Sequence, residues 1–221
     1  MMALDQLDLM QKLAVWALPV LFAITLHEAA HGWMAEKLGD KTARMLGRVS
    51  LNPIKHIDPI GTILVPAALL WFGGFIFGWA KAVPVTMKNL RNPRVDMAWV
   101  AIAGPAANLL MALLWALVLK IGFILVATQP GIGQFMIYSG IAGVSINLIL
   151  MILNLLPIPP LDGSRILSAF LPSQWSWQYN RLEPYGLFIL LGMLFFGVLG
   201  PILMGPYGVL QQLIYQVFGV I

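Results

Sequence analysis

Long apolar runs alternate with short polar stretches along the chain. Four runs approach the roughly 20 residues that a helix needs to cross a bilayer, and they cover residues 12–37, 97–119, 132–156 and 184–204. A fifth run, residues 60–80, is interrupted by Pro66 and several glycines, so it either crosses or enters and returns. Residues 207–221 carry glutamines on one side, as an interfacial helix does. The pattern predicts an all-α polytopic membrane protein with about four to six transmembrane helices.

Two short stretches between these runs have the period of a strand rather than of a helix. Apolar and polar positions alternate over residues 44–51, and residues 82–87 have a similar pattern. The two stretches can pair with each other. We therefore expect a small membrane-associated β hairpin or a re-entrant segment beside the helices.

Composition agrees with a membrane protein and limits the chemistry. Hydrophobic residues make up 60% of the chain and charged residues only 10%. The chain has no cysteine, which excludes disulfides and thiolate metal sites. Its net charge of +4 is modest, and no basic and aromatic pattern suits nucleic acid. The positions of Lys and Arg therefore indicate membrane orientation rather than nucleic-acid binding.

The sequence HEAAH, from His27 to His31, lies inside the first apolar run. Residues four apart share a face of a helix, so the two imidazoles can bind one metal ion. Glu28 is turned by about 100° from His27 and can reach a water molecule on that metal as a general base. The same residues could also form an ordinary polar patch. Burying them in an apolar span is costly unless something pairs them, which favours the metal site.

A third metal ligand must come from elsewhere in the chain. Catalytic zinc sites have three protein ligands and an open position, and without cysteine the third ligand must be His, Asp or Glu. Asp162 is the best candidate, because prolines just before it break the helix and present it from an irregular segment. The alternative for Asp162 is a simple helix cap.

Two further polar residues have roles to be assigned. His56 is expected to form hydrogen bonds in a loop beside Asp58 rather than to bind metal. Asn108 lies within an apolar run, where it either joins helices through a hydrogen bond or serves the site.

Three motifs in order carry a family resemblance. HEAAH, AGPAAN at residues 103–108 and NLLPIPPLDG at residues 154–163 together resemble the site-2 protease family of intramembrane zinc metalloproteases. The resemblance covers about residues 13–171. GRVSLNPIKHIDPIGT, residues 47–62, is similar to a loop of small prokaryotic members. Larger members carry PDZ or CBS domains, for which we expect no room here.

The resemblance implies roles for single residues. One Zn²⁺ ion would be bound by His27, His31 and Asp162, and Glu28 would be the catalytic base. Asn154 would stabilise the oxyanion that develops during hydrolysis. We expect one integral membrane metalloprotease domain over residues 1–221, with a catalytic core at about residues 12–171 and C-terminal helices at residues 184–221.

The resemblance also implies a substrate: a transmembrane protein or peptide within the lipid bilayer. Such a substrate must unwind before attack, and it could then add to the edge of the predicted strands. Two other functions stay open: a zinc-dependent membrane hydrolase of a lipid or small molecule, and a zinc-binding membrane protein without catalysis. Glu28 favours an enzyme, because a site that only binds metal needs no base. The sequence leaves the oligomeric state open.

Orientation follows from the requirement that the histidines and Asp162 meet at one depth. Their two spans must run in the same direction, so one span lies between them and residues 60–80 should not cross. Basic residues flank residues 60–80 on both sides, which places both flanks on the cytoplasmic side. We therefore expect an integral membrane protein of the prokaryotic cell (inner) membrane, with the active site nearer the cytoplasmic side.

Overall fold

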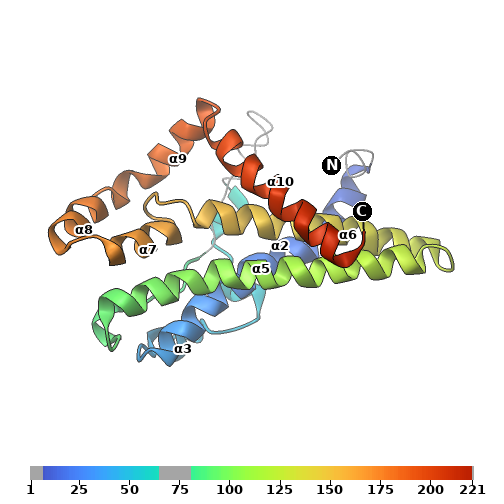
Figure 1. Cartoon of the computed structure of the whole chain (residues 1–221). Coiled ribbons are helices and arrows are strands. Elements are labelled where there is room, and N and C mark those ends of the chain that lie inside the picture. Colours follow the sequence, from blue (N-terminus) through green and yellow to red (C-terminus); the bar gives the residue numbers. More distant parts are fainter. Residues whose placement is uncertain (1–6, 65–80, 221) are drawn as a thin grey trace.

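The structure is a computed structural model that describes residues 7–64 and 81–220. All regular secondary structure in these two ranges is helical (Figure 1). Three long helices form the body of the protein: α2 (Leu9–Lys37), α5 (Pro93–Leu125) and α6 (Pro130–Asn154). Helices α5 and α6 form a hairpin with extensive contacts, and α2 packs against both. The prediction of a helical protein is confirmed.

Shorter elements surround this body at one end and along one side. They are α3 (Thr42–Met45), η1 (Pro53–His56), the π-helix η2 (Pro59–Leu64), η3 (Met87–Asn89), α7 (Asp162–Phe170), α8 (Ser173–Asn180), η4 (Glu183–Tyr185), α9 (Gly186–Phe195) and α10 (Leu199–Phe218). Helix α7 packs on α5, and α10 packs on α6 (Figure 1). The body and α7 together position the candidate site.

Three helices, α2, α5 and α6, are long and apolar enough to cross a membrane. A bent pair, Ser173–Phe195 with Leu199–Phe218, raises the number to four if it is one span. The described residues therefore reach only the lower end of the expected four to six spans. The prediction that residues 60–80 enter the membrane and return without crossing concerns mostly residues 65–80, which lie outside the described residues.

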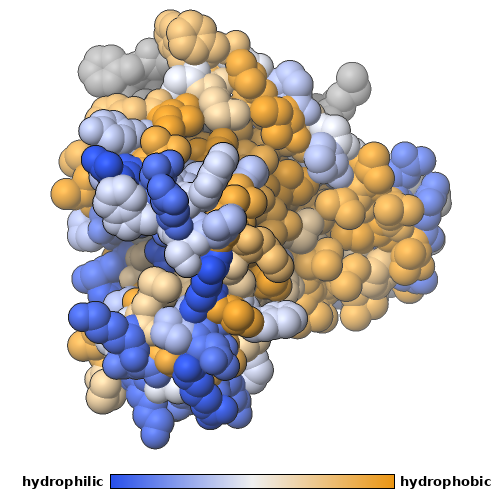
Figure 2. All heavy atoms as spheres, turned by 60° about the vertical axis from the view of Figure 1, so that its left-hand side comes forward, coloured by the Kyte–Doolittle hydropathy of each residue, from blue (hydrophilic) through white to orange (hydrophobic). Residues whose placement is uncertain are grey.

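The exposed surface is divided into a hydrophilic end and an apolar flank. Figure 2 shows hydrophilic side chains gathered at lower left and a broad hydrophobic flank on the right. One exposed stripe of α5 consists of large apolar residues at helical spacing: Leu110, Leu114, Leu117, Ile121 and Ile124. A stripe of this kind in a long helix suits contact with lipid rather than water. The protein is thus an integral membrane protein by its surface as well as its composition.

Small residues bring α5 and α6 into close contact. A Cβ on Gly140 would lie 2.6 Å from the Cβ of Leu119, and one on Gly143 would collide with the ring of Trp115. Only glycine lets the backbones approach so closely, which favours van der Waals packing in lipid. The hairpin is therefore a rigid support for residues that α5 presents to α2.

The predicted β strands do not form in the described residues. Residues 42–45 form the short helix α3, and residues 46–52 are turns and irregular backbone. The Asp40 carboxylate accepts the backbone N–H of Thr42 at 3.0 Å, a local bond that favours a turn just before α3. Val49 and Val83 do lie together against Gly32, so the two stretches are neighbours without a strand ladder.

The predicted span over residues 184–204 is interrupted in the structure. The break lies at residues 196–198, between α9 and α10. Gly197 has a φ of +70° and ends α9, a conformation that glycine adopts without strain. Pro201 lies in the first turn of α10, where its missing N–H leaves no bond unmade. Residues 207–218 continue α10 instead of forming a separate interfacial helix.

Candidate metal centre

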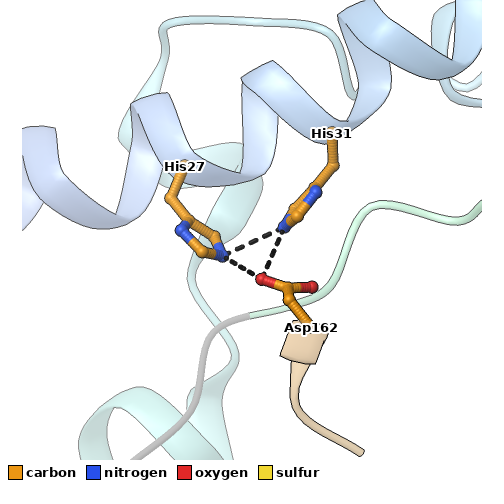
Figure 3. Close-up of side chains that lie close together, drawn as sticks. All are labelled: His27, His31 and Asp162. Carbon is orange, nitrogen blue, oxygen red and sulfur yellow. Dashed lines mark hydrogen bonds and ion pairs between the residues drawn. The ribbon is translucent and has the colours of Figure 1, made fainter. Parts of the chain in front are cut away.

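Three side chains from two distant parts of the chain meet at one point (Figure 3). His27 and His31 project from adjacent turns of α2, and Asp162 is the first residue of α7. The two Nε2 atoms are 3.0 Å apart, and each lies 3.3 Å from Oδ2 of Asp162. Both histidines are buried, and Asp162 is largely shielded from solvent.

The irregular segment between α6 and α7 places Asp162 at this point. Helix α6 ends at Asn154, and the prolines that follow prevent it from continuing past the site. Gly163 then packs against the end of α6, where a Cβ would lie 2.5 Å from the carbonyl oxygen of Leu156. Glycine at this position therefore lets α7 start close enough to α2 for its first residue to reach the histidines.

Hydrogen bonds fix which nitrogen of His27 faces the cluster. Asn108 donates its amide hydrogens to the carbonyl oxygen of Ala23 at 3.2 Å and to Oδ1 of Asn147 at 3.0 Å. Its own carbonyl oxygen therefore faces Nδ1 of His27 at 2.6 Å and accepts a proton from it. In the neutral ring, Nε2 then has no hydrogen and directs its lone pair toward Asp162.

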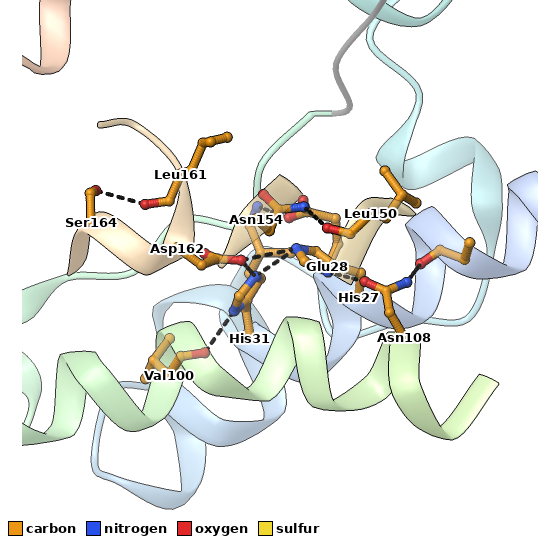
Figure 4. Close-up of polar contacts among 12 residues, drawn as sticks. His27, Glu28, His31, Val100, Asn108, Leu150, Asn154, Leu161, Asp162 and Ser164 are labelled. Carbon is orange, nitrogen blue, oxygen red and sulfur yellow. Dashed lines mark hydrogen bonds and ion pairs between the residues drawn. The ribbon is translucent and has the colours of Figure 1, made fainter. Parts of the chain in front are cut away.

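His31 is oriented in the same way by a backbone group. Its Nδ1 lies 2.7 Å from the carbonyl oxygen of Val100 on α5, an atom that can only accept a hydrogen bond (Figure 4). Nδ1 of His31 is therefore the donor, and in the neutral ring its Nε2 also carries a lone pair. Both imidazoles are held by α5 with their Nε2 atoms toward each other.

This arrangement of lone pairs fits a metal ion. Three acceptor atoms face one another at 3.0–3.3 Å, and Oδ2 of Asp162 is buried without a hydrogen-bond donor. Such a cluster is repulsive unless a cation lies among its members. Ligands about 2.0–2.1 Å from a tetrahedral zinc ion lie about 3.3 Å apart, close to the observed spacing. Two imidazoles and a carboxylate are also a usual catalytic zinc set.

Glu28 and Asn154 lie beside the three ligands (Figure 4). The Glu28 carboxylate accepts the backbone N–H of Val83 at 2.8 Å, so it is held by the segment that follows residue 80. The Asn154 amide donates to the carbonyl oxygen of Leu150 at 2.9 Å, within α6. Both side chains are only partly buried.

Gly104 on α5 leaves the space that the two histidine rings occupy. A Cβ at Gly104 would collide with Nε2 of His31 and lie 2.6 Å from Cε1 of His27. Any side chain at this position would push the metal-binding atoms away from Asp162. The sequence AGPAAN thus contributes twice to the site, through the absence of a side chain at Gly104 and through the amide of Asn108.

We expect Gly104→Ala to lower zinc affinity by about 10-fold or more, by the same displacement of ligands that other supporting residues cause when changed. Alanine favours a helix over glycine, so the change should not unfold α5. Zinc titration against a chromophoric chelator measures the effect. Gly205→Ala in α10 is the matched control, because nothing lies within 4 Å of its Cβ. Equal zinc affinity of the two variants would contradict the proposed crowding.

The structure brings together His27, His31 and Asp162 as the sequence predicted, with Glu28 next to them. His56 lies apart from this cluster, and its Nε2 is 2.9 Å from the carbonyl oxygen of Ser50, in line with the expected loop role. Asn108 forms both of the contacts that were considered alternatives: it joins α5 to α6 and orients His27.

Sequence reasoning missed three backbone or amide contacts to the site. They are the carbonyl of Val100, the N–H of Val83 and the amide of Asn147, which bonds Asn108. The position of a backbone group cannot be read from a sequence pattern, so nothing predicted the contacts of Val100 and Val83. Asn147 could have been singled out, because like Asn108 it is a polar amide within an apolar run.

Comparison with known proteins gives concordant results. The model of a family described as Peptidase family M50 matches residues 15–136 and 122–197. YwhC of Bacillus subtilis, a candidate zinc metalloprotease, is 38% identical over 195 residues, which are 85% of this chain and 82% of YwhC. Rip2 of Mycolicibacterium smegmatis, also a candidate zinc metalloprotease, is 31% identical over 79% of this chain and 64% of Rip2. The chain thus spans slightly less than two thirds of Rip2. No solved structure matches the chain significantly.

Proposed function

The chain belongs to peptidase family M50, the site-2 protease family, and from this premise we propose that it is an intramembrane zinc metalloprotease. Its substrates would be membrane proteins, cleaved within or near their transmembrane segments in regulated intramembrane proteolysis. One observation carries the proposal: two imidazoles and a carboxylate direct one nitrogen or oxygen atom each at one point, next to Glu28, in a chain with helices long and apolar enough to span a membrane.

The residues divide the chemistry among them. His27, His31 and Asp162 would hold zinc, which when bound activates water and polarises the carbonyl under attack. Glu28 takes the proton from the attacking water as its oxygen bonds to the carbonyl carbon. Glu28 then passes this proton to the amide nitrogen as the carbon–nitrogen bond breaks. Asn154 donates a hydrogen bond to the carbonyl oxygen as that oxygen gains negative charge.

We also propose a depth for the site in the membrane. His27 and His31 lie in the C-terminal half of α2, which ends at Lys37. Two basic stretches, 41–55 and 81–94, lie near this end. We place this end toward the cytoplasm of a prokaryotic cell, following the rule that basic loops stay inside. A substrate would then be cut near the cytoplasmic surface of its span.

We expect both flanks of residues 60–80 to face the same side of the membrane. The Asn89 amide donates to Oγ1 of Thr42 at 3.2 Å, so the two flanks meet in the structure. Lys41→Cys and Lys88→Cys, made one at a time in this cysteine-free chain, place exposed thiols there. A membrane-impermeant thiol reagent should label both from the same side, and Thr128→Cys, between α5 and α6, from the other. Labelling of positions 41 and 88 from opposite sides would contradict this topology.

Cleavage by the purified chain tests the proposed function. The protein is reconstituted in lipid vesicles with zinc and given a panel of single-span model peptides, and mass spectrometry identifies any products. We expect cleavage that stops when a chelator removes zinc and resumes when zinc returns. Absence of cleavage across the panel, with release of fatty acid from the vesicle lipid, would instead support a lipid hydrolase. Zinc binding without any hydrolysis would overturn the enzyme assignment.

A further inference from the structure

Asp40 is a fully buried carboxylate that the proposed chemistry does not use. It follows α2 directly and accepts hydrogen bonds from two separate parts of the chain. The backbone N–H and hydroxyl of Thr42 bond its Oδ1, as does the side-chain amide of Asn89 at 2.9 Å. The backbone N–H of Thr86 bonds its Oδ2 at 2.6 Å. Asp40 thus joins the end of the metal-binding helix to residues 86–89.

The same segment reaches Glu28 from its other end. Three residues before Thr86, the N–H of Val83 donates to Oε2 of Glu28 at 2.8 Å. The Val83 side chain is buried against Gly32 of α2. Three residues of chain span at most about 10 Å, so a short stretch of backbone links the two anchoring points. A shift of Thr86 away from Asp40 would therefore move the amide that holds Glu28.

Asp40 is well suited to hold this segment. Burial raises the pKa of the Asp40 carboxyl, but hydrogen bonds from Thr42, Asn89 and Thr86 outweigh burial and leave that pKa below its usual value. The side chain is therefore an ionised acceptor at neutral pH. Hydrogen bonds to an ionised acceptor are about twice as strong as those between neutral groups.

We propose that Asp40 is a positioning residue for the catalytic base: it anchors residues 81–89 against α2, so that the Val83 amide orients the Glu28 carboxylate. A single N–H donor occupies one oxygen of a carboxylate, and the other oxygen then faces the proton of the attacking water. This inference rests on the proposed function, because it assumes that Glu28 is a base. The proposal gives Asp40 an indirect effect on turnover, because Asp40 itself would contact neither metal nor substrate.

Asp40→Asn tests the proposal, because it keeps the shape of the side chain but replaces one acceptor oxygen by an amide that cannot accept. We expect zinc content to stay at the wild-type value, kcat to fall about 10-fold or more, and KM to change less. Hydrogen exchange at the Val83 amide should accelerate by at least 10-fold. Asp8→Asn is the matched control: Asp8 also accepts a backbone N–H, that of Gln11 at 2.8 Å, but at the far end of α2.

A disulfide can replace the anchor and separate positioning from a general loss of structure. The hydroxyl oxygens of Thr42 and Thr86 are 3.1 Å apart, so cysteines at both positions are close enough to bridge. In the Asp40→Asn background, oxidised Thr42→Cys with Thr86→Cys should restore at least half of the lost kcat and the protection of the Val83 amide. Reduction of the disulfide should remove both gains.

Three results would overturn the proposal. The first is wild-type kcat and Val83 protection in Asp40→Asn, and the second is loss of zinc from that variant in parallel with activity. The third is an oxidised double-cysteine variant that regains Val83 protection but no turnover. If Asp40→Asn does not accumulate, Asn89→Ala should shift kcat and Val83 exchange in the same direction by less. Because exchange needs no substrate, a wild-type chain that cleaves nothing would count against the proposed function, and exchange would still decide whether Asp40 anchors Val83.

Discussion

Glu28→Gln should reduce peptide hydrolysis by a factor of at least 100 while leaving one zinc ion per chain. Positioned general bases contribute about 10²–10⁴ to a rate, and glutamine cannot take up the proton. The three ligand atoms come from other residues, and the glutamine carbonyl can still accept the N–H of Val83. Initial rates of peptide cleavage and metal analysis of the same preparation measure the two effects separately.

Glu36→Gln provides the matched control for this change. Glu36 lies two turns further along α2, where its carboxylate pairs with Arg44 at 2.6 Å, far from any role in the proposed chemistry. Loss of a partly exposed ion pair costs at most about 1 kcal/mol of stability, so this variant should keep wild-type turnover. Near-normal proteolysis by Glu28→Gln would remove Glu28 from the mechanism, whatever the behaviour of the control.

The helices were predictable because each carries its own signal. Runs of about 20 apolar residues indicate spans whatever else the chain does, and α2, α5 and α6 follow those runs to within a few residues at most ends. The meeting of His27 and His31 needed only the helical period. Asp162 needed one further argument, the lack of cysteine, together with prolines that end α6.

The prediction of strands was wrong because, unlike a helix, a strand does not carry its whole signal in its own residues. A strand exists only through its partner, so alternation over residues 44–51 is a weak signal. In the structure, nearby acceptors bind the backbone donors of both stretches. Glu28 accepts the N–H of Val83 and Asp40 accepts that of Thr86, while the N–H groups of residues 45–48 bond carbonyl groups of residues 41–44 in local turns. No continuous row of donors is left for a ladder. The two segments still lie together, which is what the pattern indicated.

The support of the site was predictable only in part, because it depends on contacts between distant residues. Asn108 and His27 are separated by 81 residues, and no periodicity specifies that their side chains meet. Gly104 could be identified as a residue that permits close helix packing, but not as the residue that faces the histidine rings. The role of Asp40 could not be predicted for the same reason, since two of its partners, Thr86 and Asn89, lie 46 and 49 residues further along the chain.

Asp162→Ala should abolish both zinc binding and peptide hydrolysis. Only two ligands remain after this change, and two imidazoles on one helix hold zinc far less tightly than three ligands in a closed cluster. Metal analysis after dialysis should fall from one zinc per chain to below about one tenth, with turnover below detection. Helix α7 should persist, because the favourable effect of an acidic residue in its first turn is only about 0.3–1 kcal/mol.

Two companion variants make the result specific to the ligand. Arg165→Ala changes an exposed residue on the same helix and should keep full zinc occupancy and turnover. Asp162→Glu retains the carboxylate but moves it by one methylene, so it should recover part of the zinc affinity that alanine loses. Full zinc occupancy with unchanged affinity in Asp162→Ala would mean that another residue supplies the third ligand. The lone pairs of His27 and His31 would then have to converge on a metal ion placed away from Asp162, although its Oδ2 lies 3.3 Å from both.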